Sequence, residues 1–308
     1  MSSPERPQED RTSHHIIHGD AARMAFIPES SIHLALTRPP SWLRLQRYGP
    51  NGRPRPPADD YGEFLTDLET ILTQVYRILA PGGRLVCLAR DIWLSRKQYG
   101  RHRVIPFAAD VSVVCRRIGF DHLNPIVWNR GDRLQPAKGA GPLFLGNPYE
   151  PNGIIKQQLD CILLERKPGG YRQPTAGQRS LSRINKSDYL KWFRPFWDLS
   201  GEAPSGPSDP FPAEIARRLV RMFSFRGDTV IDPFCGSGTI LLAALRDHRS
   251  SVGIDIRSDR CRLAFNRLQE ASEPLFSQTR LSYAEIEDVA AAAPPEPEAP
   301  PPGSGEEK

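Results

Sequence analysis

The sequence predicts an α/β fold with a mainly parallel sheet, and three observations support this. Segments patterned like strands alternate with amphipathic helices along most of the chain, which is typical of βαβ units. A glycine turn joins an apolar strand directly to a helix in TVIDPFCGSGTILLAAL, residues 229–245. A further strand, VGIDI, follows that helix within one βαβ unit's length.

The spacing of apolar residues assigns each element in turn. Steps of three and four residues predict a helix over Tyr61–Leu79, which the Pro81-Gly82-Gly83 turn ends. Short apolar runs predict strands at Ile32–Thr37, Arg84–Ala89, Pro125–Trp128, Leu159–Glu165, Asp228–Asp232 and Ser251–Ile256. Further helices are expected at Phe107–Ile118, Phe211–Phe225, Thr239–Arg246 and Asp259–Glu270.

Composition and charge exclude several classes of protein. The net charge is +5, and an acidic C-terminal stretch makes the rest more basic still, which indicates a polyanionic partner, with plain solubility charge as an equal alternative. The five cysteines form no CxxC pair, so no metal site or disulfide framework is expected, and a reducing cytoplasm is the default location. No apolar run reaches the ~18 residues of a membrane span, and the polar start lacks a signal-peptide core.

Composition also divides the chain into five segments. Residues 1–13 and 273–308 are expected to be disordered, the second as an acidic Pro/Ala-rich tail. Residues 14–165 and 209–272 carry the strand and helix pattern and are predicted to form two halves of one domain. Residues 166–208 are basic and aromatic, and we expect them to lie outside the sheet.

The turn after Asp232 has the features of a ligand site. Gly236 and Gly238 permit positive φ angles and a close approach of backbone to ligand. Leu241 stands where a dinucleotide fingerprint needs a third glycine, and Asp232 would repel a pyrophosphate. Asp255 ends the next strand, where a carboxylate can hold a ribose diol. The combination describes an S-adenosylmethionine site, with plain turn glycines and solvated acids as the alternative.

A second unusual strand end lies in LALTRPPSWL, residues 34–43. Pro39 and Pro40 have no backbone N–H, so they cannot continue a β-ladder. The Pro39 carbonyl is therefore expected to be left without a ladder partner and to face a binding site. Arg38 precedes the prolines and Trp42 follows them closely.

With the glycine turn late in the chain and the Pro-Pro strand early, the sequence resembles the β-class (permuted) exocyclic-amine DNA methyltransferases, the N4-cytosine/N6-adenine family. The similar runs cover most of Ile16–Glu270 and are IIHGDA, ESSIHLALTRPPSW, YGEFLTDLETILTQVYRILAPGGRLVCLA and PFPAEIARRLVRMFSFRGDTVIDPFCGSGT. The resemblance implies a Rossmann-like S-adenosylmethionine-dependent methyltransferase sheet, mostly parallel with one antiparallel hairpin strand. It also implies that residues 166–208 are an inserted target-recognition region.

The resemblance assigns residues to the cofactor S-adenosyl-L-methionine. Asp20 would accept a hydrogen bond from the adenine amino group, unless it is only a turn or helix cap. Asp255 would hold the ribose, Asp232 would lie near the amino acid end, and Phe211, between Pro210 and Pro212, would close over the cofactor. The methionine moiety would be surrounded by Pro233, Phe234, Gly236 and Gly238.

The same resemblance implies a catalytic motif made of Thr37, Arg38, Pro39, Pro40 and Trp42. In the family, the first proline's carbonyl and a preceding Ser, Asp or Asn accept from the target amine, and an aromatic residue stacks on the flipped base. Here Arg38, which has no acceptor atom, stands at the acceptor position. Ser41 stands at the aromatic position, with Trp42 one place later.

Three interpretations of Arg38 remain open. Thr37 and the Pro39 carbonyl accept from the amine while Arg38 contacts the base or a phosphate, or the enzyme is impaired, or Arg38 pairs with a structural acid. Trp42 either stacks on the base or is an exposed strand-end residue that packs on a loop. A threonine before this position resembles the Thr-Ser-Pro-Pro pattern of cytosine-N4 enzymes more than an Asp-Pro-Pro pattern.

Basic runs predict a surface for double-stranded DNA. Residues 166–194 hold eight Lys or Arg, at 166, 167, 172, 179, 183, 186, 191 and 194, against the single acid Asp188. DNA contacts are predicted for Arg44, Arg47, Arg172, Arg179, Arg183 and Lys186. Another basic group is expected to line the same cleft, namely Arg96, Lys97, Arg101, His102 and Arg103, with ordinary solvated faces as the alternative.

The sequence therefore predicts a DNA methyltransferase that modifies N4 of a flipped cytosine in double-stranded DNA. Adenine N6, an RNA substrate and a catalytically impaired DNA-binding module are the alternatives. A homodimer and a cognate restriction endonuclease are further expected partners, in a bacterial-type cytoplasm near the nucleoid.

Overall fold

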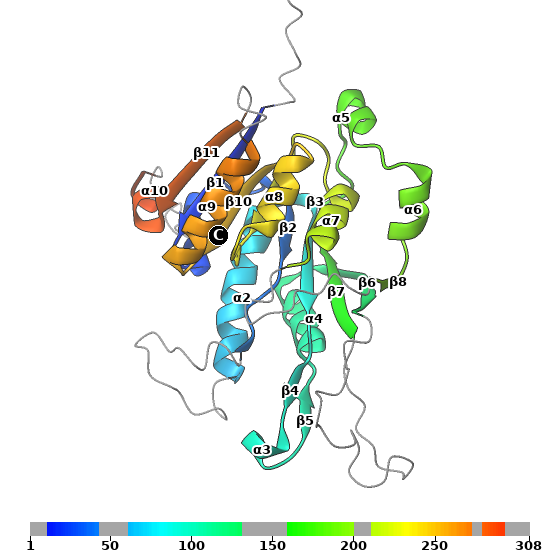
Figure 1. Ribbon diagram of the computed structural model, residues 1–308, viewed down its shortest axis with the longest axis vertical. Helices are drawn as coiled ribbons and strands as arrows, with labels where there is room; N and C mark the ends of the chain where they lie inside the picture. The colour runs from blue at the N-terminus through cyan, green and yellow to red at the C-terminus, as the bar shows by residue number, and fades with distance from the viewer. Residues whose placement is uncertain (1–10, 43–60, 131–158, 200–210, 273–278, 293–308) are drawn as a thin grey trace, which may run out of the picture.

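One mixed sheet of nine strands organises the part of the chain that the computed structural model describes, residues 11–42, 61–130, 159–199, 211–272 and 279–292 (Figure 1). The strand order is β11-β1-β10-β9-β2-β3-β7-β6-β8. The strands are β1 (Thr12–His18), β2 (Ile32–Thr37), β3 (Leu79–Ala89), β6 (Asp121–Asn129), β7 (Leu159–Arg166), β8 (Phe196–Asp198), β9 (Thr229–Asp232), β10 (Ser250–Asp255) and β11 (Thr279–Glu285).

The neighbouring strands from β11 to β3 all run parallel to one another. β7 runs antiparallel to both of its neighbours, β3 and β6. The predicted sheet, mostly parallel with one antiparallel strand, is thus confirmed. A short antiparallel hairpin, β4 (Ile92–Leu94) and β5 (Arg103–Ile105), forms a separate ladder next to α3 (Arg96–Tyr99).

Helices cover both faces of the sheet, because successive residues of a central strand point to opposite sides. Ala35 of β2 packs in the cluster formed with α2 (Tyr61–Ile78) and α4 (Phe107–Ile118). Leu34 and Leu36 pack on the other side with α7 (Ala213–Phe223) and α8 (Thr239–Arg246). α9 (Ser258–Ser272) extends that second layer and packs on α8 and β1 (Figure 1).

The predicted helices are confirmed to within two residues at each end, and the predicted strands β2, β7, β9 and β10 to within one residue at each end. β3 and β6 are longer than expected. The Pro81-Gly82-Gly83 turn follows the end of α2, as predicted, but it also belongs to β3, where the pairing with β2 shifts register between Ile32 and Leu34.

The structure corrects three expected boundaries. Residues 279–292, expected in the tail, form β11 and α10 (Ile286–Ala292), because Leu281 and Tyr283 pack on the α9 cluster and Ile286 is buried. β1 begins at Thr12, within the expected disordered start. Residues 166–208 are not wholly outside the sheet, since β8 pairs with β6 and buries Trp197. The other elements of that region are α5 (Ala176–Leu181) and α6 (Lys186–Trp192).

No helix in the described ranges is long and apolar enough to cross a membrane. Within the same ranges, no group of three or more His, Cys, Asp or Glu side chains is placed to hold a metal ion.

Candidate active site

Four adjacent parallel strands, β1, β10, β9 and β2, bring the predicted site residues to one edge of the sheet. The carboxyl ends of parallel strands lie at the same edge, which is the usual ligand position in such sheets. β9 ends at Asp232, β10 at Asp255 and β2 at Thr37, while the turn of Gly19 and Asp20 follows β1. The catalytic and cofactor motifs, nearly 200 residues apart in sequence, are therefore neighbours in space.

Asp232 joins the two motifs directly. Thr37 Oγ1 donates to Asp232 Oδ1 at 2.7 Å, and the Phe234 N–H donates to the same oxygen at 3.1 Å. The Asp232 side chain is buried, and this burial raises the pKa of its carboxyl to about 7; the two hydrogen bonds oppose that rise and nearby Asp255 adds to it. The proton of the Thr37 hydroxyl is thus engaged within the protein, and Thr37 itself is fully buried.

The two glycines of the turn have different structural roles. Gly236 has a φ of 52°, and its N–H donates to Asp255 Oδ2 at 2.9 Å. Gly238 has a φ of 75°, and a Cβ there would lie 2.8 Å from the Ala264 Cβ, so this glycine lets the start of α8 pack against α9. Gly236 therefore ties the turn to Asp255, whereas Gly238 allows α8 and α9 to pack closely.

Asp255 is oriented by its own turn. Besides Gly236, the Arg257 N–H donates to the other carboxylate oxygen, Oδ1, at 2.9 Å. Burial raises the pKa of Asp255, and these two backbone donors oppose the rise. Each oxygen keeps lone pairs for further donors. The geometry suits the predicted ribose contact.

Asp20 lies at the same edge of the sheet, in a turn that contacts α10 and the end of β11. It is exposed, and it caps the 3-10 helix η2 (Ala21–Phe26) by accepting from the Ala22 N–H at 2.9 Å. A Cβ on Gly19 would lie 2.4 Å from Ile286 of α10, so the turn and α10 are in close contact. His18 Nδ1 lies 2.5 Å from Glu285 Oε2, and Arg23 Nη1 donates to Glu287 at 2.8 Å.

The contact between Ile286 of α10 and the Gly19 turn leads to a prediction for Ile286→Ala. Removing a buried side chain from this contact should lower the free energy of unfolding by about 2–4 kcal/mol. Because the Gly19 turn loses its backing, we also expect weaker binding of the ligand at this edge. Thermal unfolding and ligand titration of this variant, beside the exposed control Leu263→Ala, measure both effects. A variant that unfolds and binds like the control would contradict the role of α10.

The Pro-Pro motif is arranged differently from the expectation at two positions. Trp42 is only 3% exposed and its ring packs edge to face on Tyr61, with centroids 5.4 Å apart, so no open indole face is available for a base in this structure. Neither predicted option, stacking or exposed packing, describes this burial by the start of α2. Pro39 is buried and Arg38 is half-buried, with contacts of its own.

Other predicted residues are placed as follows. Pro233 is buried and Phe234 half-buried within the turn, whereas Phe211 is buried in the cluster around α7. Arg172 is paired with Asp228 and lies over the Phe225 ring, so its guanidinium already has partners within the fold, and its DNA contact stays a prediction. Arg179, Arg183 and Lys186 are exposed on or next to α5 and α6. Arg44, Arg47 and Pro210 lie outside the described residues.

Two features of this edge were not predicted. Asp160, at the start of β7, is buried and accepts two hydrogen bonds from Arg90, at 2.7 and 2.8 Å, while Arg130 lies 3.3 Å away. Ile256, directly after Asp255, has a side chain that is 69% exposed. The sequence shows that Ile256 is an apolar residue directly after a strand-end acid. Its exposure could not be predicted, because it depends on how the surrounding elements pack.

Comparison with known proteins agrees with this geometry. The family model described as DNA methylase, N6_N4_Mtase, matches residues 32–266. The type II methyltransferase M.MjaI of Methanocaldococcus jannaschii is 31% identical over 274 residues, covering 80% of this chain and 88% of that protein. The DNA adenine methyltransferase YhdJ of Escherichia coli is 26% identical, covering 83% of each chain.

Solved structures show the same fold. A candidate DNA modification methylase from Thermus thermophilus, solved in complex with S-adenosyl-L-methionine, is 40% identical with a TM-score of 0.70, and the match covers 87% of this chain and 99% of that one. The cytosine-N4-specific PvuII DNA methyltransferase shares the fold at 17% identity, with a TM-score of 0.59 over 90% and 96% of the two chains. The chain thus belongs to the N6/N4 DNA methylase family, enzymes that use S-adenosylmethionine to methylate an exocyclic amino group of a DNA base.

Proposed function

We propose that the protein methylates N4 of a cytosine flipped out of double-stranded DNA. The observation that carries the proposal is the 2.7 Å hydrogen bond between Thr37 and Asp232, because it ties the strand ending in Pro39 and Pro40 to the glycine turn. The group that would orient the target amine thus lies beside the turn that would hold the methyl donor. Thr37 favours cytosine as the target base, because a threonine at this place resembles the Thr-Ser-Pro-Pro pattern of cytosine-N4 enzymes.

The residues at this edge fit the cofactor. When bound, S-adenosylmethionine supplies an electrophilic methyl group. Asp255 would accept from its ribose hydroxyls, and Asp20 from its adenine amino group. The exposed side chain of Ile256 offers an apolar face for the adenine ring. Asp232 would place negative charge near the cationic part of the ligand, which favours a sulfonium or ammonium over a phosphate.

Catalysis by this chain would centre on the Pro39 carbonyl. An exocyclic amine is a poor nucleophile because its lone pair is delocalised into the ring, and positive charge grows on the nitrogen during attack. A carbonyl that accepts from the amine stabilises this charge more in the transition state than in the ground state. Because neither proline donates to the sheet, the ladder ends here and the strand end can meet a flipped base.

We assign Arg38 a contact with DNA rather than a role in the methyl transfer. A guanidinium cannot accept from the amine, and its charge would oppose the growing positive charge. We expect Arg38→Ser to lower kcat/KM for DNA by about tenfold, mainly through KM, since a charge-assisted contact contributes about 1.5–3 kcal/mol. Steady-state kinetics with Arg117→Ser as the control measure this. A kcat/KM of Arg38→Ser equal to or above the wild-type value would show that Arg38 does not contribute to DNA recognition.

The target atom is tested with labelled S-adenosylmethionine and unmethylated double-stranded DNA, followed by digestion to nucleosides and chromatography. Label in N4-methylcytosine is the expected result. Label in N6-methyladenine would establish the alternative, which the 26% identical adenine methyltransferase of Escherichia coli favours. Label in RNA alone, or DNA binding without any label, would overturn the proposal.

The surface of α5 and α6 is the proposed target-recognition region. Arg179, Arg183 and Lys186 are exposed there. Tyr189 and Phe193 stack with centroids 4.5 Å apart and are 52% and 42% exposed, which provides flat apolar surface beside the cations. A homodimer and a cognate endonuclease remain further predictions, to be tested by light scattering and by protection of methylated DNA from cleavage.

A further inference from the structure

A hairpin extends past the edge of the sheet on the side of the Pro-Pro motif (Figure 1). β3 runs beside β2 with Cys87 opposite Thr37, and it ends two residues later at Ala89. The chain then continues directly into β4, α3 and β5. Since β3 and β2 are parallel, the hairpin leaves the sheet from the same edge as Pro39 and Pro40.

The base of the hairpin is built into the core. Ile92, Leu94 and Ile105 are 7%, 0% and 9% exposed, and they belong to the cluster that includes α2 and α4. Asp91, just before β4, accepts from the Ala108 N–H at 3.1 Å in the first turn of α4. The arm is therefore fixed relative to the active site by packing and by this hydrogen bond.

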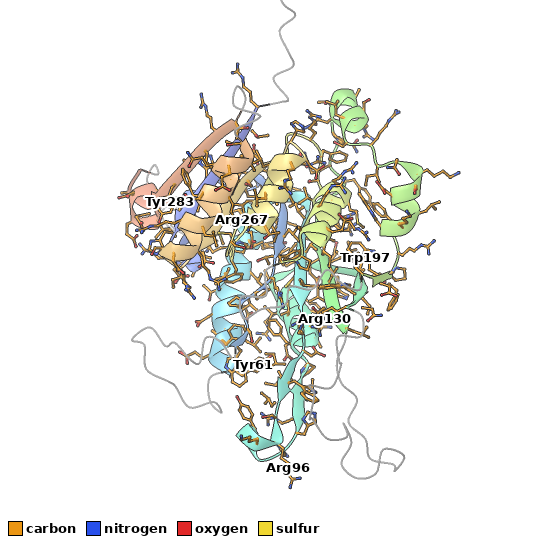
Figure 2. All side chains as sticks on the ribbon, viewed as in Figure 1. Tyr61, Arg96, Arg130, Trp197, Arg267 and Tyr283 are labelled. Carbon is orange, nitrogen blue, oxygen red and sulfur yellow. The ribbon has the colours of Figure 1, made fainter. Side chains whose placement is uncertain are left out.

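The outer part of the hairpin is strongly basic. Residues 92–105 contain Arg96, Lys97, Arg101, Arg103 and His102, and no Asp or Glu. All four Lys and Arg side chains are exposed, and none of them forms an ion pair or hydrogen bond with another of the residues that the structure describes. Figure 2 shows Arg96 at the far end of the arm.

These unpaired cations contrast with the neighbouring arginines. Arg90 is bound to Asp160, Arg117 to Glu69 and Arg166 to Asp121. Four exposed like charges on one short arm, without counter-charges among the described residues, create a positive potential that attracts a polyanion. The arrangement favours a ligand with regularly spaced negative charges.

The outward face of the ladder adds an apolar strip. Trp93 and Val104 are opposite each other across the ladder and are 37% and 47% exposed, while Ile92, Leu94 and Ile105 point into the core. The Trp93 ring meets His102 edge to face, with centroids 4.1 Å apart. Flat apolar surface between cations suits a sugar-phosphate backbone better than a small anion.

We propose that this hairpin binds the phosphodiester backbone of double-stranded DNA beside the target base and holds the duplex against the edge where the base is flipped. The inference rests on the proposed action on double-stranded DNA. Arginine forks match phosphate oxygens without reading sequence, so the arm contributes affinity and register rather than base specificity. The partner is a duplex, because the arm leaves the sheet at the edge where β2 ends in the Pro-Pro motif, which is where the proposed reaction flips a base out of double-stranded DNA.

The test compares two variants that lose the same charge. The hairpin variant carries Arg96→Gln, Arg101→Gln and Arg103→Gln. The control carries Arg11→Gln, Arg116→Gln and Arg280→Gln, exposed arginines near the opposite ends of the strands and α4. Binding to a fluorescent duplex is measured from about 0.05 to 0.2 M salt, together with S-adenosylmethionine binding, thermal unfolding and methylation rate.

We expect the hairpin variant to bind the duplex at least about tenfold more weakly than the control at about 0.1 M salt, with a salt slope smaller by about 1 for each arginine lost. The weakening should be equal for different sequences, and cofactor binding and thermal unfolding should match the control. Equal DNA binding by the two variants would overturn the inference, as would a loss confined to RNA. Wild-type protein that methylates no duplex DNA would instead overturn the proposed function.

Discussion

Asp255→Ala is expected to weaken S-adenosylmethionine binding by about 100-fold. The carboxylate can accept two hydrogen bonds from the ribose, and a hydrogen bond to a charged group contributes about 1.5–3 kcal/mol. The substitution also removes the acceptor for the Gly236 and Arg257 N–H groups, so the turn proposed to hold the ligand loses two anchors. Isothermal titration with the cofactor alone measures the change in Kd.

The matched control for this prediction is Asp259→Ala. Asp259 lies four residues later, is exposed, and pairs only locally with Arg257 at 2.7 Å among the described residues. Its removal should change the cofactor Kd less than about twofold, in keeping with the small contribution of surface ion pairs. DNA binding should be unchanged in both variants. A Kd for Asp255→Ala that equals that of the control would overturn the ribose assignment.

The second large effect is a pH dependence of the free energy of unfolding, which the Asp232 carboxyl causes. Burial raises the pKa of this carboxyl from 3.8 to about 7, so the folded protein holds the proton over a range in which the unfolded chain releases it. The resulting stability is fully present below about pH 4 and is lost as the pH rises through about 7. Against Asp232→Asn, wild type should therefore lose about 4 kcal/mol of unfolding free energy across this range.

Denaturant unfolding from about pH 4 to 8 measures this difference. The Asn side chain keeps an oxygen for the Thr37 hydroxyl and the Phe234 N–H, which makes it a fair reference. Asp255 also raises the pKa of Asp232, and Asp232 in turn raises the pKa of the buried thiols of Cys87 and Cys235, which stay neutral over this range. A constant difference between the two proteins would show that Asp232 is ionised throughout.

The same carboxyl should make cofactor binding depend on pH. A cationic ligand favours the ionised form of Asp232, so binding at acidic pH must release its proton. The cofactor affinity of wild type is expected to rise by up to about tenfold per pH unit below pH 7 and then to level off. Asp232→Asn should show a flat profile. Equal profiles for the two proteins would place the cationic part of the ligand away from Asp232.

Local pattern was sufficient for α2, α4, α7, α8 and α9, for the strands from β10 to β6 in the sheet order, and for the two motifs, but not for the short helices or for β1, β4, β5, β8 and β11. The α2 helix follows from apolar residues at helical spacing, and the glycine turn follows from TVIDPFCGSGT. β11 was missed because its residues alternate weakly and its burial depends on α9. The pairing of Arg172 was missed for a related reason: a basic residue in a basic run does not show that Asp228, 56 residues away, will lie beside it.

The sequence by itself determined the parallel sheet, the positions of the glycine turn and of the Pro-Pro strand end, and the resemblance to exocyclic-amine DNA methyltransferases, because these depend on residue types at short spacing. Only the tertiary structure decided that Thr37 bonds to Asp232, that Trp42 is buried against Tyr61, and that the basic residues 96–103 form an arm beside the active site. Those relations come from strand order and packing between distant segments, which local spacing does not encode.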